Sequence, residues 1–282
     1  MKKYLLLWIV SATVCMGCTD QQFQENALAD FHQQKSNNEI NTLIKQARWG
    51  DGQAFLKLAD CYRDGNGVEK DFVGMLCMLA QAREYGGIDC MEDYLKKLPE
   101  GSDFKMIFDA IDKYEKKQTD EANLMAEQLI AQGSPDGYTV QGVMAVERGD
   151  TLGGRRLMEQ AAAQGSTFAE LMLVFPEWNT HNTPNIKRLK ELSDKMPLAN
   201  AILAKFYAKS ERNEQLAAHY YLKADEKAFL GKRGARWLLS NLQFVDNLSL
   251  SKRDIERLQM LAGERVIEES DEIIEVDTLG TE

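Results

Sequence analysis

The sequence has few of the features that mark chains without a globular fold. Five prolines and 20 glycines among 282 residues exclude a collagen-like or low-complexity chain. Basic residues are in the minority, and the net charge of −10 argues against a nucleic-acid surface. After the first 16 residues, no apolar run is long enough to span a membrane. The remaining composition, 44% hydrophobic and 28% charged, is typical of a large globular domain or a helical array.

Residues suited to catalysis or metal binding also lack the usual spacings. The histidines, which share no metal-ligand spacing, are His32, His181 and His219. Neither a Gly-x-Ser-x-Gly nucleophile motif nor a phosphate-binding loop occurs. Asp60 and Asp71 bound a segment that is similar to a calcium loop, but Tyr62 and Val68 stand where oxygen ligands are needed. We therefore expect no enzymatic activity, no cofactor and no metal site.

The first residues have the layout of a bacterial export signal. Two lysines precede a short apolar run that ends at Met16, and Gly17 and Cys18 follow it. This junction resembles the lipobox of bacterial lipoproteins, in which the chain is cut before a cysteine that is then acylated. The resemblance implies that residues 1–17 are a lipoprotein signal peptide and that Cys18 carries the acyl chains, palmitate among them. Secretion without lipidation is the alternative.

A lipid anchor would place the protein in the bacterial cell envelope. Thr19 follows the cysteine in place of Asp, which favours the outer membrane, at its periplasmic face or at the cell surface. Residues 18–37 would form a tether and a first helix. At the other end, residues 266–282 carry seven acids and no base, which predicts a solvated tail. Ile273 and Ile274 within it keep open a partner-binding role.

Residues 38–265 are predicted to be all-α. Apolar residues recur three and four positions apart, and alternation over strand lengths is scarce. The tetrapeptide Ala-Gln-Gly-Ser at residues 131–134 returns at 163–166, and the pattern Ala-x-x-x-Leu-Ala-x-x-Tyr begins at Ala54 and again at Ala199. Such copies indicate helical hairpins that bury their apolar stripes only by stacking on one another. The predicted fold is an α-solenoid of roughly six hairpins.

One unit, residues 47–86, carries a more specific pattern. It combines an alanine-rich helix, a Gly-x-Gly-Val turn at Gly65, Gly67 and Val68, an aspartate at Asp71, and a second helix that ends in alanines and a glycine. This pattern resembles the Sel1-like repeat, a tetratricopeptide-like unit. The resemblance implies stacked antiparallel hairpins that act as a scaffold for protein recognition, with no particular reaction attached. We expect the two glycines to supply unusual backbone conformations, Val68 to plug the hairpin end and Asp71 to cap the second helix.

Cys61 and Cys77 lie across the same predicted turn. An oxidising envelope permits a disulfide between them. The two positions are nevertheless offset by about one helical turn, and a bridge tolerates a Cα separation of only about 7 Å. A disulfide and a pair of buried thiols both stay open.

Four aromatic residues are candidates for a binding surface, because repeat packing does not account for them and solenoids commonly bind partners on their inner curve. They are Trp49, Trp178, Tyr220 and Tyr221. We expect a membrane-anchored lipoprotein whose repeats bind an envelope protein or peptide, and no nucleic acid. The alternatives are a structural or regulatory envelope factor and a hydrolase that acts on the cell wall or on antibiotics.

Overall fold

The structure, a computed structural model, describes residues 37–86, 91–174, 185–245 and 250–263. Helices and turns make up these ranges, and no strand occurs within them. The expected signal peptide, Cys18, Trp178 and the acidic tail lie outside the described residues.

A helix at residues 37–47 opens the described chain. The helices that follow are α2 (Gly52–Asp64), α3 (Phe72–Gly86), α4 (Met91–Lys96), α5 (Asp103–Glu115), α6 (Thr119–Ala131), α7 (Asp136–Glu147), α8 (Thr151–Ala163), α9 (Thr167–Val174), α10 (Ile186–Leu192), α11 (Pro197–Phe206), α12 (Glu214–Asp225), α13 (Gly231–Asn241) and α14 (Lys252–Ala262). A π-helical turn, η2 (Tyr207–Glu211), continues α11, and a 3₁₀ turn, η3 (Leu242–Phe244), follows α13.

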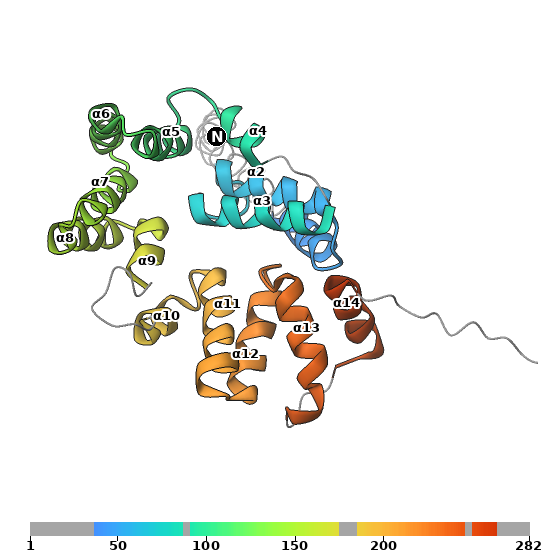
Figure 1. Ribbon diagram of the computed structural model, residues 1–282. Helices are drawn as coiled ribbons and strands as arrows, with labels where there is room; N and C mark the ends of the chain where they lie inside the picture. The colour runs from blue at the N-terminus through green and yellow to red at the C-terminus, as the bar shows by residue number, and fades with distance from the viewer. Residues whose placement is uncertain (1–36, 87–90, 175–184, 246–249, 264–282) are drawn as a thin grey trace, which may run out of the picture.

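Consecutive helices pack as antiparallel hairpins. The pairs are α2 with α3, α5 with α6, α7 with α8, α11 with α12, and α13 with α14. Neighbouring units stack on one another, so that α5 contacts α7 and α7 contacts α9. The expected all-α solenoid of stacked antiparallel hairpins is confirmed. Figure 1 shows that α5, α7 and α9 lie on the inner side of the curve, with α6 and α8 outside them, and that α11, α12 and α13 lie side by side.

Glycine makes the closest contacts within the hairpins. In the α7–α8 pair, a Cβ on Gly142 would lie 2.8 Å from the Gly154 carbonyl oxygen, and a Cβ on Gly154 would lie 2.5 Å from the Gly142 oxygen. In the α2–α3 pair, a Cβ on Gly52 would lie 2.5 Å from the Gly86 Cα. The two backbones in each pair therefore touch directly, which is why small residues recur at fixed positions in the repeat pattern.

The α5–α6 hairpin forms where the repeat signature is barely recognisable. The Ser102 side chain accepts a hydrogen bond from the Lys105 N–H and caps α5. Ile107 and Ala110 on α5 are fully buried, as are Ala122, Ala126 and Leu129 on α6. Helical spacing of apolar residues is therefore enough to build the unit without the characteristic turn.

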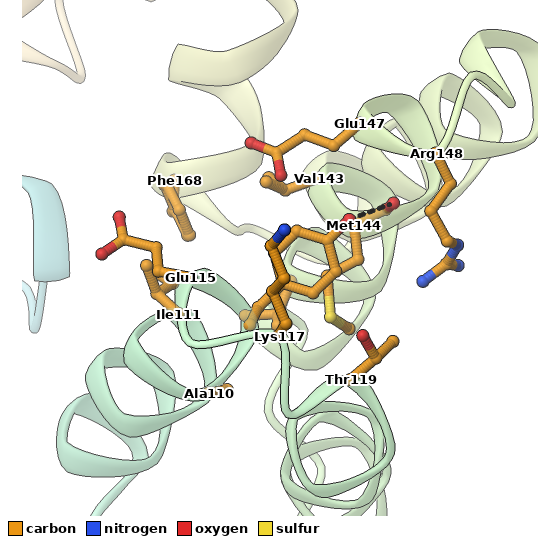
Figure 2. A pocket seen from close by; sticks show the side chains of 12 residues that line it. Ala110, Ile111, Glu115, Lys117, Thr119, Val143, Met144, Glu147, Arg148 and Phe168 are labelled. Atoms are coloured by element: carbon orange, nitrogen blue, oxygen red, sulfur yellow. Dashed lines mark hydrogen bonds between the residues drawn. The ribbon is translucent and has the colours of Figure 1, made fainter.

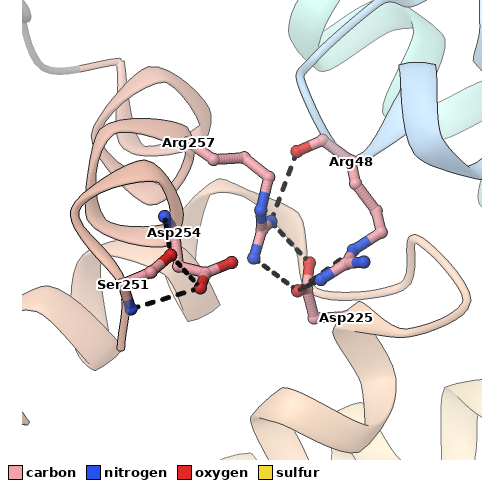
Figure 3. Close-up of polar contacts among 5 residues, drawn as sticks. All are labelled: Arg48, Asp225, Ser251, Asp254 and Arg257. Carbon is pink, nitrogen blue, oxygen red and sulfur yellow. Dashed lines mark hydrogen bonds and ion pairs between the residues drawn. The ribbon is translucent and has the colours of Figure 1, made fainter. Parts of the chain in front are cut away.

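The two ends of the described array meet, as Figure 3 shows. Arg257 on α14 donates to both carboxylate oxygens of Asp225, at 2.9 and 2.7 Å, and Arg48 donates to the same carboxylate at 2.7 Å. We call these three residues the closure cluster. Nearby, the Phe229 ring meets the edge of the Tyr62 ring, with centroids 6.2 Å apart. The solenoid therefore closes on its own first unit.

Candidate functional site

The Gly-x-Gly-Val turn lies at the end of the α2–α3 hairpin. Gly65 and Gly67 have φ angles of 72° and 73°, a left-handed conformation that favours glycine. The Asp71 carboxylate accepts a hydrogen bond from the Val73 N–H at 2.9 Å, and Val68 is half-buried against the main core. The Thr167 hydroxyl of α9 also donates to Asp71, at 2.7 Å. The turn thus joins two units, and no feature of it suggests a ligand.

Cys61 and Cys77 carry free thiols, so the disulfide left open by the sequence is not formed in the structure. Burial and the neighbouring Asp71 raise the pKa of Cys77 to about 12. Burial and several nearby acids, Asp60 first, also raise the pKa of Cys61. Both sulfurs are therefore protonated at neutral pH and are weak nucleophiles.

The described aromatic candidates do not gather into one site. Trp49 is half-buried beneath the Arg253 guanidinium, 5.7 Å from the ring centre, beside the closure cluster. Tyr220 stacks on Tyr207, with ring centroids 5.7 Å apart. The expectation that Tyr221 offers a binding surface is wrong, because it is 8% exposed and packs in the core of the C-terminal hairpins. Its position on α12 turns it inward, which spacing alone did not distinguish.

A groove on the inner face offers a site for a ligand. It has a volume of about 440 Å³ and is lined by α5, α7 and the first turn of α9. Its apolar floor consists of Ala110, Ile111, Tyr114, Val140, Val143, Met144 and Phe168. We call it the inner groove. The Tyr114 hydroxyl donates a hydrogen bond to the Met144 carbonyl oxygen at 3.4 Å, which joins α5 to α7 at the groove.

Four exposed charged residues form the rim of the inner groove: Glu115, Lys117, Glu147 and Arg148. Within the described chain, their side chains make no ion pair or hydrogen bond with one another or with other residues. In Figure 2, Glu115 and Glu147 lie on the side of Phe168, and Arg148 lies at the opposite end. An apolar floor with unpaired charges of both signs around it suits a polypeptide better than a small ion.

A second pocket, of about 360 Å³, lies between α9 and α11. Its floor is apolar, and its lining includes Lys205, Lys209 and Ser210 but no acid. The apolar residues are Leu171, Leu198, Ile202 and Phe206. We call it the lysine pocket.

A polar cluster between α7 and α9 holds the inner helices together. The Ser166 hydroxyl donates to the Asp136 carboxylate and accepts the Ala169 N–H at 2.9 Å, which caps α9. Burial, opposed by the Ser166 hydrogen bond, raises the pKa of Asp136, and the nearby Asp71 raises it further. The hydrogen bonds of this cluster join α7 to α9 and cap α9, which indicates a structural role.

Sequence reasoning missed the residues of both pockets. Tyr114 and Lys117 fall in the stretch where the repeat signature is lost, and no motif in the sequence distinguishes Phe168 or Phe206. One signal was available: in both α5 and α7, an apolar helix ends in a charged pair, Glu115 with Lys117 and Glu147 with Arg148.

In the described chain, no cluster of three or more His, Cys, Asp or Glu residues could hold a metal ion. Its helices are also too short or too polar to cross a membrane.

Comparison with known proteins gives one solved structure to report. No family model matches the sequence, and no curated protein matches it. The structure is similar to that of a protective antigen of uropathogenic Escherichia coli that displays an SLR fold, with 16% sequence identity and a TM-score of 0.43. The match covers 79% of this chain and 48% of the antigen, so the chain spans about half the length of that protein. SLR denotes the Sel1-like repeat, the unit that residues 47–86 resemble.

Proposed function

We propose that this protein is a lipid-anchored scaffold of the bacterial cell envelope and that it binds an apolar segment of another protein in the inner groove. The observation that carries the proposal is the combination of an open apolar floor with four unpaired charges on the concave side of a helical-repeat array. Solenoids bind partners on such extended concave surfaces because neighbouring units together form one continuous groove.

The size and lining of the groove support a side-chain anchor. A volume of about 440 Å³ falls within the range of about 300–1,000 Å³ that is typical of ligand sites. Tyr114, Val143 and Phe168 are only half-buried, so part of their apolar surface meets solvent in the free protein. Covering that surface gains about 25 cal/mol per Å² before the entropy of association is subtracted. Aromatic residues at the centre of a groove are typical binding hot spots.

The lipid anchor is supported by the Gly17-Cys18 junction at the end of the apolar leader. Acyl chains contribute about 0.8 kcal/mol per buried methylene, so two or three of them hold a protein on a membrane almost permanently. The test is metabolic labelling with an alkyne-bearing palmitate analogue in a Gram-negative host. We expect the wild-type protein to be labelled and to sediment with membranes. The Cys18→Ser variant should lose the label, and labelling of this variant would refute the assignment.

Binding in the groove is tested by photo-crosslinking in intact cells. A photoreactive amino acid replaces Val143 on the groove floor, and the matched control places it at Leu152 on α8, which is 73% exposed. We expect a covalent adduct with one identified protein at position 143 and none at 152. The adduct should disappear when Phe168 is changed to Asp and should persist in the Cys18→Ser variant if both proteins reach the same compartment. Equal adducts at both positions would argue against a dedicated site.

A further inference from the structure

We infer that the inner groove and the lysine pocket bind one continuous, extended polypeptide segment, which has an apolar anchor for each pocket and an acidic residue beside the anchor in the lysine pocket. This inference rests on the proposed function and specifies the chemistry of the partner.

Helix α9 joins the two pockets. Phe168 lines the inner groove, and Leu171, three residues later on the same helix, lines the lysine pocket. Side chains three positions apart on a helix are neighbours. The inner groove lies against α5 and α7, and the lysine pocket lies against α11. A segment that crosses α9 from α7 to α11 would therefore pass over both.

Charge selects an acidic residue at the second anchor. Lys205 and Lys209 lie one helical turn apart, both are exposed, and neither forms an ion pair within the described chain. No acid lines the pocket, so the two ammonium groups repel each other and neither is held by a carboxylate within it. A carboxylate placed between them relieves that repulsion. The inner groove, which carries two acids and two bases, imposes no such preference.

The width of α9 sets the spacing of the anchors. The inner groove lies on one side of α9 and the lysine pocket on the other, and a helix with its side chains is about 10–12 Å wide. An extended chain advances about 3.3 Å per residue and covers that distance in about three or four residues. A helical ligand fits less well. A helix with its side chains is about 10–12 Å wide, and pockets of about 440 and 360 Å³ can hold its side chains but not the helix itself.

The test uses the full chain, purified in detergent, and a phage-displayed library of random 16-residue peptides. We expect enriched peptides to share two apolar positions about three or four residues apart, with Asp or Glu next to one of them. The strongest peptide is then synthesised with a fluorophore, and its Kd is measured by fluorescence anisotropy. Three variants are compared: Val143→Lys in the inner groove, the pair Lys205→Glu and Lys209→Glu in the lysine pocket, and a control pair.

The control pair is Lys57→Glu and Lys252→Glu, two exposed lysines on α2 and α14 whose reversal changes the net charge equally. We expect the lysine-pocket pair to weaken binding about two- to thirty-fold, because each exposed ion pair contributes little. The control pair should leave the Kd within about two-fold. Added salt should weaken binding to the wild type more than to the lysine-pocket variant.

Three results would overturn the inference. Peptides with one apolar position that are insensitive to the lysine-pocket reversal would leave the proposed function standing and remove the second anchor. Failure to enrich any peptide would remove both. A gain in affinity of more than about tenfold on deletion of residues 266–282 would show that the chain's own acidic tail, and not a partner, occupies the site.

Discussion

The closure cluster permits a quantitative test of what holds the two ends of the array together. Asp225 and Arg257 are 2% and 6% exposed at their side chains, and the second arginine, Arg48, is 31% exposed. The Asp225→Asn substitution keeps the shape of the side chain but removes the negative charge that both guanidinium groups share. Arginine does not lose its proton in proteins, so the variant leaves two positive charges close together, one of them fully buried.

Breaking a buried ion pair by removing one partner destabilises a protein by about 3–5 kcal/mol. Arg48 can turn toward water, so we expect a loss near the lower end, about 3 kcal/mol in the free energy of unfolding. The matched control is Glu92→Gln, which breaks an exposed pair with Lys96 and should leave the free energy of unfolding nearly unchanged. Changing all three closure residues to apolar side chains of similar size should recover much of the stability, because no charge is then left buried.

The assay is urea unfolding followed by far-UV circular dichroism, together with native-state hydrogen exchange. In the Asp225→Asn variant we expect amides of α14 and of residues 37–47 to lose protection first, while those of α7 and α8 lose less, because the two ends separate before the middle unfolds. A loss below about 1 kcal/mol, or equal loss of protection in all helices, would refute the view that this carboxylate holds the ends together.

Three further predictions concern packing, pH and cysteine chemistry. The Gly154→Ala variant should lose about 1–3 kcal/mol, because the new Cβ meets backbone atoms of α7, while Leu152→Ala on the same helix should change thermal stability little. Because Asp136 has a raised pKa in the folded state, the wild type should gain stability relative to Asp136→Asn as the pH falls from 7, with the full gain present below the reference value of 3.8. Urea unfolding at several pH values measures this, and a gain with rising pH would have the wrong sign. Iodoacetamide at pH 7.4 should modify Cys61 and Cys77 slowly in the native protein and rapidly in urea, as read by peptide mass spectrometry; a mass loss of a disulfide would contradict the free thiols.

The fold could be predicted from local patterns because each hairpin is formed by residues that are close together in the sequence. The alanines and leucines that pair α2 with α3 are close in the sequence, and the same spacing recurs in the later units. Closure of the array could not be predicted, because Arg48 and Asp225 are 177 positions apart and no motif links them. The candidate site followed the same division: the turn residues were found where the signature is strong, whereas Tyr114 and Phe168 come from different units whose contact depends on the curvature.

Tyr221 shows the limit of reasoning from composition. Two adjacent tyrosines on a helix necessarily point in directions about 100° apart, so they cannot both line one surface. Tyr220 stacks on Tyr207 and is half-buried, and Tyr221 packs against Trp237. The choice between them depends on which neighbour each meets, and that information lies in other units of the chain.

Closure of the array limits how its length can change. In an open array, one hairpin can be lost or duplicated and the remaining units still stack, because each unit contacts only its neighbours. Here the same event would carry Asp225 out of reach of Arg48, which would lose its counter-ion, while Asp225 would keep only its pair with Arg257. The number of units is therefore fixed by a contact between the first and the last. A nascent chain also cannot complete the contact until the helix that bears Arg257 has been synthesised.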